Sequence, residues 1–148
     1  MRIATSRFGE VDIDEQRVLT FPSGLLGFPD DKRFALLEAG QDAEFWWLQS
    51  IERAELAFIV TDPTLFVPTY EVPIGQQQME GLGLSSLDEA QVLVIVNKRG
   101  NVLTGNLQGP LVMNVAKRTG EQLVLSDRRF TTRVPLMELP EPVQAQSA

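Results

Sequence analysis

The sequence predicts an all-β fold: a small closed or partly closed antiparallel β-barrel-like domain with meander connections and very little helix. Short apolar runs separated by glycine- and proline-containing turns recur along its 148 residues. The stretch 92–125 shows this most clearly, because apolar segments alternate there with reversals at 98–101, 108–110 and 117–120. Only residues 74–90 interrupt the pattern. A closed barrel is favoured over an open sandwich because closure removes exposed sheet edges.

The first half of the chain predicts five strands and one edge strand. Apolar and acidic residues alternate over 10–14, which indicates a half-buried strand, and 17–21 is expected to pair back onto it. Further strands are expected at 34–38, 45–50 and 56–60. The run 66–72 also reads as extended. Pro68 and Pro73 place it at a sheet edge, because proline cannot donate to a ladder.

The stretch 22–29 predicts a packed loop that plugs one end of the sheet. Two glycines and two prolines prevent a regular element, while Leu25, Leu26 and Phe28 favour burial. Gly24, Gly27 and Phe28 are therefore interpreted as a structural motif.

The second half predicts one helical turn over 76–80 and a second over 87–90, capped by Ser86. Gly100 or Asn101 is expected to supply the positive φ of a hairpin. Strands are expected at 92–96, 102–107, 111–116, 123–125 and 130–135. A single domain is expected to span 1–137. The segment 138–148, with two prolines and no periodicity, is expected to be a disordered tail.

Three residues near the reversal at 108–110 are interpreted as structural. Pro110 can begin a strand because it has no N–H to lose. Asn106 and Asn114 are expected to hold this corner by bonding backbone groups, since an unpaired buried amide costs about 1–3 kcal/mol.

Composition excludes several kinds of chemistry. The chain has no cysteine and no histidine, which removes thiol chemistry, the commonest general base and the commonest metal ligand. Its net charge is −7, and residues 1–97 alone carry six basic and sixteen acidic side chains. Such a surface repels nucleic acid and attracts basic partners. No apolar run approaches the ~20 residues of a membrane span, and no signal-like start is visible, so a cytoplasmic protein is expected.

An ordered set of short motifs resembles the flagellar assembly factor family, FliW. In chain order these motifs are Phe8-Gly-Glu10, Phe21-Pro-x-Gly-Leu-x-Gly-Phe28, Leu48-Gln-Ser50, Ala57-Phe-x-Val60, Asp62-Pro63, Phe66-x-Pro-x-Tyr70, Leu82-Gly-Leu84, Asn106-Leu-x-x-Pro-Leu-Val-x-Asn114, Gln122-x-x-Leu125 and Arg133-x-Pro-Leu136. The resemblance spans residues 8–136. It implies a compact β-barrel-like regulator without catalysis, cofactor or metal.

The same resemblance implies two protein partners. Proteins similar to this one bind flagellin in the cytoplasm and also bind CsrA, the small RNA-binding translational regulator. When secretion drains flagellin, the freed factor captures the regulator and relieves repression of flagellin translation. The resemblance thus implies a protein partner switch with no direct contact to nucleic acid or membrane.

The preferred contact surface is the expected edge over 66–71. Tyr70 supplies an amphipathic aromatic and Glu71 a negative charge suited to a basic partner. Strand alternation would place Phe66 and Tyr70 on one face and Glu71 on the other. The competing interpretation is that Phe66 and Tyr70 belong to the core.

Three carboxylates, Glu10, Asp12 and Asp14, are expected to share one strand face. Their spacing of about 7 Å falls within the roughly 6.5–9.5 Å of an inverting glycosidase pair. A carbohydrate-active β-barrel enzyme is therefore the alternative function. A solvated acidic face that receives a basic partner is favoured, because general acid catalysis needs a buried carboxyl.

A third hypothesis is an RNA-binding module that uses basic turns. Lys98, Arg99, Lys117 and Arg118 lie in alternate turns of the expected meander and should gather at one end of it. Charged, hydrated turns are the favoured interpretation, since no stacking aromatics interleave with these residues.

Overall fold

The computed structural model describes residues 1–39 and 44–140. Its strands are β1 Arg2–Thr5, β2 Gly9–Asp12, β3 Val18–Thr20, β4 Arg33–Glu38, β5 Phe45–Ser50, β6 Ala57–Thr61, β7 Ala90–Arg99, β8 Val102–Gly105, β9 Leu111–Asn114, β10 Thr119–Gln122 and β11 Val134–Glu138. One α-helix, α1 Gln76–Gly81, and three 3₁₀ helices, η1 Glu15–Arg17, η2 Pro63–Leu65 and η3 Leu87–Glu89, complete the described part.

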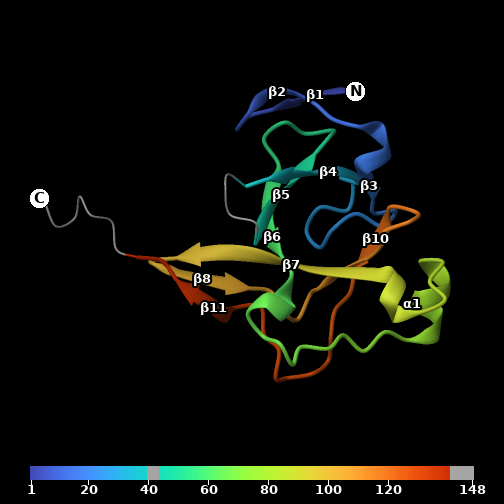
Figure 1. Ribbon diagram of the computed structural model, residues 1–148, viewed down its shortest axis with the longest axis vertical. Helices are drawn as coiled ribbons and strands as arrows, with labels where there is room; N and C mark the ends of the chain where they lie inside the picture. The colour runs from blue at the N-terminus through green and yellow to red at the C-terminus, as the bar shows by residue number, and fades with distance from the viewer. Residues whose placement is uncertain (40–43, 141–148) are drawn as a thin grey trace, which may run out of the picture.

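Seven strands close into a barrel in the order β7-β6-β5-β4-β3-β10-β9, with β9 pairing back onto β7 (Figure 1). The all-β prediction and the closure are thereby confirmed. The pairings are antiparallel except that between β3 and β10, which run parallel where Thr20 faces Thr119. This parallel pairing joins β10, from the second half of the chain, to β3, from the first.

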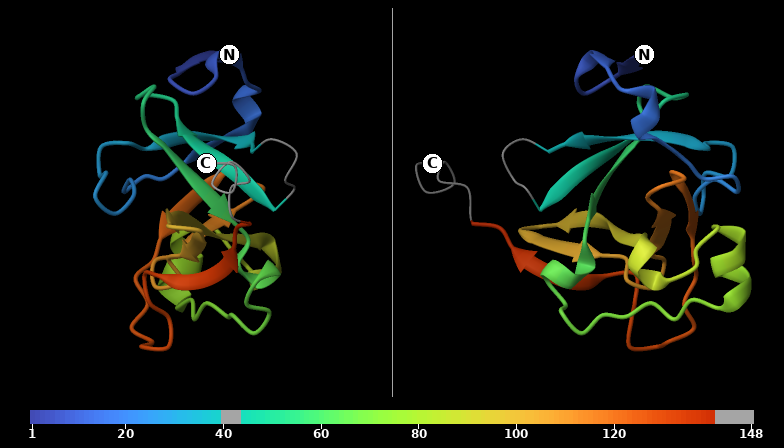
Figure 2. Two further views of the ribbon diagram at one scale, coloured as in Figure 1. Left: turned by 90° about the vertical axis from the view of Figure 1, so that its left-hand side faces the viewer. Right: turned by 45° about the vertical axis from the view of Figure 1, so that its right-hand side comes forward.

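Strand β7 is shared by the barrel and a second layer. Its first residues pair with β9, its middle with β6 and its last residues with β8, as Ala90↔Asn114 and Arg99↔Val102 mark. Strand β11 then extends the sheet beyond β8, so β8 and β11 flank the barrel (Figure 2). A single ten-residue strand therefore connects both parts of the sheet.

Two hydrophobic clusters lie on opposite sides of β7 and β9. The first fills the barrel and includes Leu93, Leu111 and a perpendicular pair of rings, Phe21 and Phe34, with centroids 5.8 Å apart. The second includes Val94 and Val112, the chain neighbours of the first two residues, under the outer segments. Successive side chains of a strand point to opposite faces. Burial on both faces explains why this part of the sequence is apolar without alternation.

The loop at 22–29 packs as predicted in part. Gly24 has φ +70°, and a Cβ there would lie 2.5 Å from the Phe28 carbonyl oxygen, so only glycine fits. Gly27 also has positive φ. Leu25 is buried, and the Phe28 ring meets Phe58 edge-on at 5.3 Å. The expected burial of Leu26 is wrong: its side chain is exposed, and its backbone N–H donates to Gln122.

The hairpin expected between 10–14 and 17–21 is wrong. Strand β2 pairs instead with β1 in a separate two-stranded sheet, and β3 pairs with β4. Between them the chain turns through η1, whose first turn is capped by the Asp14 carboxylate accepting from the Gln16 N–H at 2.9 Å. This cap redirects the chain, and the short polar segment of β1 gave no strand signal by itself.

The edge strand expected over 66–72 is also wrong. Asp62 caps η2, and the chain continues through turns in which Val67 N–H donates to Pro63 and Tyr70 N–H to Val67. Pro68 within this stretch and Pro73 directly after it have no N–H to donate, so the stretch forms turns rather than a ladder. The alternation argument for Phe66, Tyr70 and Glu71 therefore does not apply.

The remaining elements agree with the prediction except near the C-terminal end. The two expected helical turns are α1 and η3, and Ser86 caps η3. The expected strand at 123–125 is replaced by the earlier β10, and that at 130–135 by the later β11. Of the expected tail, Glu138 ends β11, whereas 141–148 lie outside the described residues.

Asn106 and Asn114 both hold turns, as interpreted, although at different places. Asn106 accepts from the Gly109 N–H at 2.9 Å and so closes the corner before the buried Pro110. Asn114 accepts from Lys117 N–H and donates to the carbonyls of Leu82, at 2.8 Å, and Gly83. The second asparagine therefore fastens the end of α1 to β9 rather than the 108–110 corner.

Candidate functional site

Tyr70 lies in the interior rather than on an exposed edge. Its side chain is 5% exposed, its ring meets Phe130 edge-on at 4.8 Å, and its hydroxyl donates to the Leu107 carbonyl at 2.7 Å. Burial raises the pKa of Tyr70 to about 12. The position of Tyr70 therefore agrees with the competing interpretation, in which this side chain belongs to the core.

The raised pKa predicts alkaline sensitivity. Because the folded-state pKa lies above the ordinary value near 10, Tyr70 contributes its stability fully below about pH 10. That contribution falls as pH rises toward 12, by up to ~1.4 kcal/mol per unit. Tyr70→Phe cannot ionise, so this variant should lose less stability between pH 10 and 12 than the wild type. Urea denaturation across that range measures the difference, and parallel losses in both proteins would contradict it.

Two residues close to Tyr70 in the sequence, Leu65 and Glu71, are exposed. Leu65, at the end of η2, is 54% exposed, and Glu71 is exposed beside the buried tyrosine. The half-buried ring of Phe66 packs on Phe45, with centroids 5.9 Å apart. Sequence reasoning missed Leu65; the Asp62-Pro63 capping pattern, which starts a helical turn, was the signal that could have found it.

The acidic hairpin β1–β2 carries two of the three predicted carboxylates. Glu10 and Asp12 are 69% and 77% exposed, and Arg2 lies between them at 3.4 and 3.5 Å. Asp14 stands apart, at the cap of η1. General acid catalysis needs a carboxyl withdrawn from water, so this surface offers charge for recognition rather than a catalytic pair. Within 1–39 and 44–140, no cluster of three or more acidic residues is placed to hold a metal ion.

An aromatic neighbour accompanies this acidic hairpin, and sequence reasoning did not single it out. Phe8 is exposed in the β1–β2 turn and meets Trp47 edge-on at 6.3 Å. The Arg7 guanidinium covers the same indole at 4.1 Å from its centroid. Aromatic side chains beside charges are typical of protein–protein contact surfaces.

The four basic turn residues do not gather. Lys98 and Arg99 lie at the last residues of β7, while Lys117 and Arg118 follow β9, whose end pairs with the first residue of β7. The prediction that they meet at one end is wrong, because β8 and β9 pair with different halves of the long β7 rather than with each other. The basic patch that the RNA-binding hypothesis requires is therefore not formed by these four residues.

Among the helices in the part of the chain that the structure describes, none has the length and apolarity needed to cross a membrane.

Comparison with known proteins gives a consistent result over the whole described fold. The family model described as FliW protein matches residues 2–136. The flagellar assembly factor FliW of Natranaerobius thermophilus is 38% identical over 139 residues, which cover 92% of each chain. That of Bdellovibrio bacteriovorus is 42% identical over 138 residues, covering 92% of this chain and 79% of its relative.

A crystal structure of the flagellar assembly factor FliW superposes with a TM-score of 0.84 at 33% identity, covering 95% of this chain and 99% of the other. These relatives are named as assembly factors and not as enzymes. The chain belongs to the FliW family of flagellar assembly factors.

Proposed function

We propose that this chain is a cytoplasmic regulator that binds flagellin and, when free of flagellin, sequesters the RNA-binding translational regulator CsrA, thereby relieving repression of flagellin translation. It acts by occupying other proteins and performs no catalysis. The observation that carries the proposal is the match to flagellar assembly factors over nearly the entire chain.

The charge of the chain supports capture of a basic partner. Its net charge is −7, and the acidic excess is concentrated in residues 1–97. A translational regulator that binds RNA presents a basic surface, which an acidic protein attracts and steers at low ionic strength. A nucleic-acid backbone would be repelled by the same field.

Two exposed surfaces are the proposed contact sites. One combines Phe66 and Glu71 with Leu65 near the buried Tyr70; Tyr70 contributes here by holding the backbone. The other is the acidic hairpin with Glu10, Asp12 and the nearby Asp14. Both pair exposed acid with apolar or aromatic side chains, which suits a contact that needs both charge and buried area.

Calorimetric titration of the purified protein with flagellin and with the regulator tests the proposal. We expect saturable binding to each, and a release of the regulator from its target RNA when this protein is added without flagellin. Adding stoichiometric flagellin should restore the RNA complex. Absence of binding to both proteins, or RNA release that flagellin leaves unchanged, would reject the partner switch.

Reversal of one charge should separate the two proposed surfaces. Glu71→Lys places a positive charge at the Leu65–Glu71 surface and should weaken regulator binding about tenfold, corresponding to about 1.4 kcal/mol. The matched control is Glu80→Lys, on the exposed side of α1, which makes the same charge change elsewhere. Equal affinities for the two variants in the titration would remove Glu71 from the contact and leave the hairpin as the candidate.

A further inference from the structure

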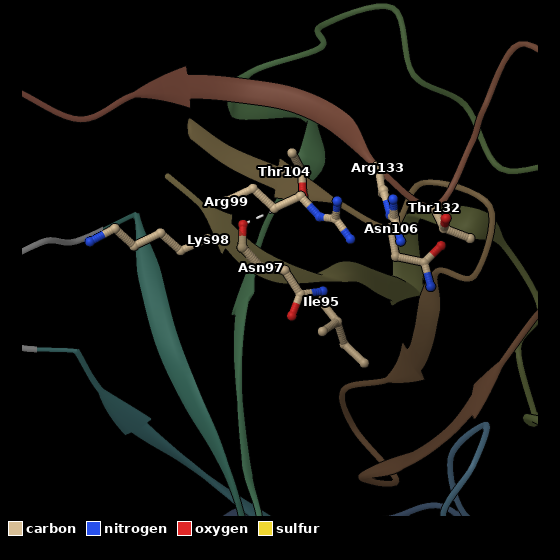
Figure 3. A pocket seen from close by; sticks show the side chains of 8 residues that line it. All are labelled: Ile95, Asn97, Lys98, Arg99, Thr104, Asn106, Thr132 and Arg133. Atoms are coloured by element: carbon tan, nitrogen blue, oxygen red, sulfur yellow. Dashed lines mark hydrogen bonds between the residues drawn. The ribbon is translucent and has the colours of Figure 1, made fainter. Parts of the chain in front are cut away.

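A polar cavity of about 420 Å³ lies on the outer layer of the sheet (Figure 3). Strands β7 and β8 form its floor, and the segment before β11 forms one wall. Its lining residues are Ile95, Asn97, Lys98, Arg99, Thr104, Asn106, Thr132 and Arg133. Its volume falls in the range of about 300–1,000 Å³ typical of small-molecule sites.

The sheet register places the polar side chains of this cavity on one face. Ile95, Asn97 and Arg99 alternate along β7, and period-2 alternation puts them on the same side. Thr104 stands opposite Asn97, and the Asn106 N–H donates to the Ile95 carbonyl. The pairing of β11 with β8 then brings Arg133, which directly precedes β11, beside this row.

The charge of the cavity is opposite to that of the molecule. The chain has twenty acidic and thirteen basic residues, yet among the described residues that line this cavity three are cations and none is a carboxylate. Arg99 and Arg133, like Arg7, Arg17, Arg118 and Arg128, form no ion pair within the described part of the chain. Two guanidinium groups that have no anionic partner among the described residues therefore share one concave site.

Neutral donors complete the arrangement. The side-chain oxygen of Asn106 is used by the Gly109 N–H, which leaves its amide group to donate. The Thr132 hydroxyl lines the same cavity. In Figure 3 the Arg99 guanidinium points to the side on which Arg133 and Asn106 lie, whereas Lys98 extends the opposite way. Planar guanidinium forks beside neutral donors match the geometry of phosphate oxygens.

We propose that this cavity binds the phosphate group of a small organic ligand, held by Arg99 and Arg133 with Asn106 and Thr132. A small ligand fits better than nucleic acid for two reasons. The site is a single concavity within an acidic molecule, which repels a polyanion. No aromatic ring is among the described residues that line it, so a base has nothing to stack on.

Amide NMR during titration with inorganic phosphate tests this site, with chloride added at matched ionic strength to remove general screening. We expect saturable shifts centred on Thr104 and Asn106. Arg99→Gln and Arg133→Gln should each weaken binding about tenfold, the loss expected for one charge-assisted contact. Arg128→Gln, an exposed arginine outside the cavity, is the matched control and should leave the affinity unchanged.

Two further titrations distinguish a small phosphate ester from the phosphate groups of RNA. Glycerol phosphate should bind at least as tightly as inorganic phosphate if the cavity accepts an organic phosphomonoester, and a short single-stranded RNA should bind more weakly. Tighter binding of the RNA through the same two arginines would overturn the assignment to a small ligand. Shifts that do not saturate, or that persist in a variant carrying both Arg99→Gln and Arg133→Gln, would overturn the proposal that this cavity binds phosphate. Because both arginines are exposed, the variants should keep the wild-type unfolding midpoint.

Discussion

Tyr70→Ala should lower the free energy of unfolding by about 3–5 kcal/mol, the range found when a large buried aromatic is truncated. Its ring is packed against Phe130 in the cluster that covers the outer face of β7 and β9. Its hydroxyl is bonded to the Leu107 carbonyl, which the alanine variant leaves without this donor. Since the total stability of a domain is about 5–15 kcal/mol, this loss is a large fraction of it.

The control for Tyr70→Ala is Tyr70→Phe, which keeps the ring and removes only the hydroxyl. Its cost should be about 1–3 kcal/mol, the penalty of an unpaired buried carbonyl. Urea denaturation monitored by tryptophan fluorescence gives both values. If Tyr70→Ala unfolded at the wild-type urea concentration but failed to bind the regulator, the side chain would be a contact residue and not a core residue.

The barrel strands were predictable because burial leaves a clear trace in apolar sequence. The apolar run 92–96 predicted a strand, and β7 separates the two hydrophobic clusters with Leu93 on one side and Val94 on the other. The hairpin signal at 98–101 was equally reliable. Gly100 has φ +60° at the β7–β8 turn, as its position in the sequence suggests.

The errors at 10–21 and at 66–72 share one physical cause, which is that capping and turn contacts compete with strand pairing over a few residues. Asp14 and Asp62 each bond a backbone N–H two residues later and start 3₁₀ turns directly before the segments 17–21 and 66–72, for which the expected pairings are wrong. Such local bonds decide the path of the chain but leave no periodicity. The pairing of strands was harder still to predict. The strands of the separate β1–β2 sheet have only four residues each, which is too short for a clear alternation of apolar and polar residues.

The candidate site was less predictable than the fold. The sequence around a tyrosine in a turn-rich stretch does not tell whether its ring is buried or faces a partner, since tyrosine occurs in both environments. Glu10 and Asp12 were placed correctly on one exposed face by alternation, yet the pairing with Arg2 could not be foreseen without the partner strand. The phosphate cavity joins residues near 97, 105 and 133, and only the β8–β11 pairing brings them together.

Asn114→Ala should lower the free energy of unfolding by about 3 kcal/mol. The asparagine is 2% exposed and makes three backbone contacts, donating to Leu82 and Gly83 and accepting from Lys117. Truncation leaves two carbonyls and one N–H without these partners, and a single orphaned buried group already costs about 1–3 kcal/mol. Because Leu82 follows α1, the loss should also loosen this helix from the barrel wall.

Asn106→Ala is the matched comparison for Asn114→Ala, because the same side chain is removed at a turn that is less deeply buried. The Asn106 side chain makes one backbone contact, accepting from the Gly109 N–H, so its loss should cost about 1 kcal/mol. Thermal unfolding should therefore rank wild type above Asn106→Ala and Asn106→Ala above Asn114→Ala. Hydrogen exchange should show faster opening over 76–84 in Asn114→Ala only. If exchange there matched the wild type, the amide would not be what fastens α1 to β9, and the packing of Leu82 and Leu84 alone would hold it.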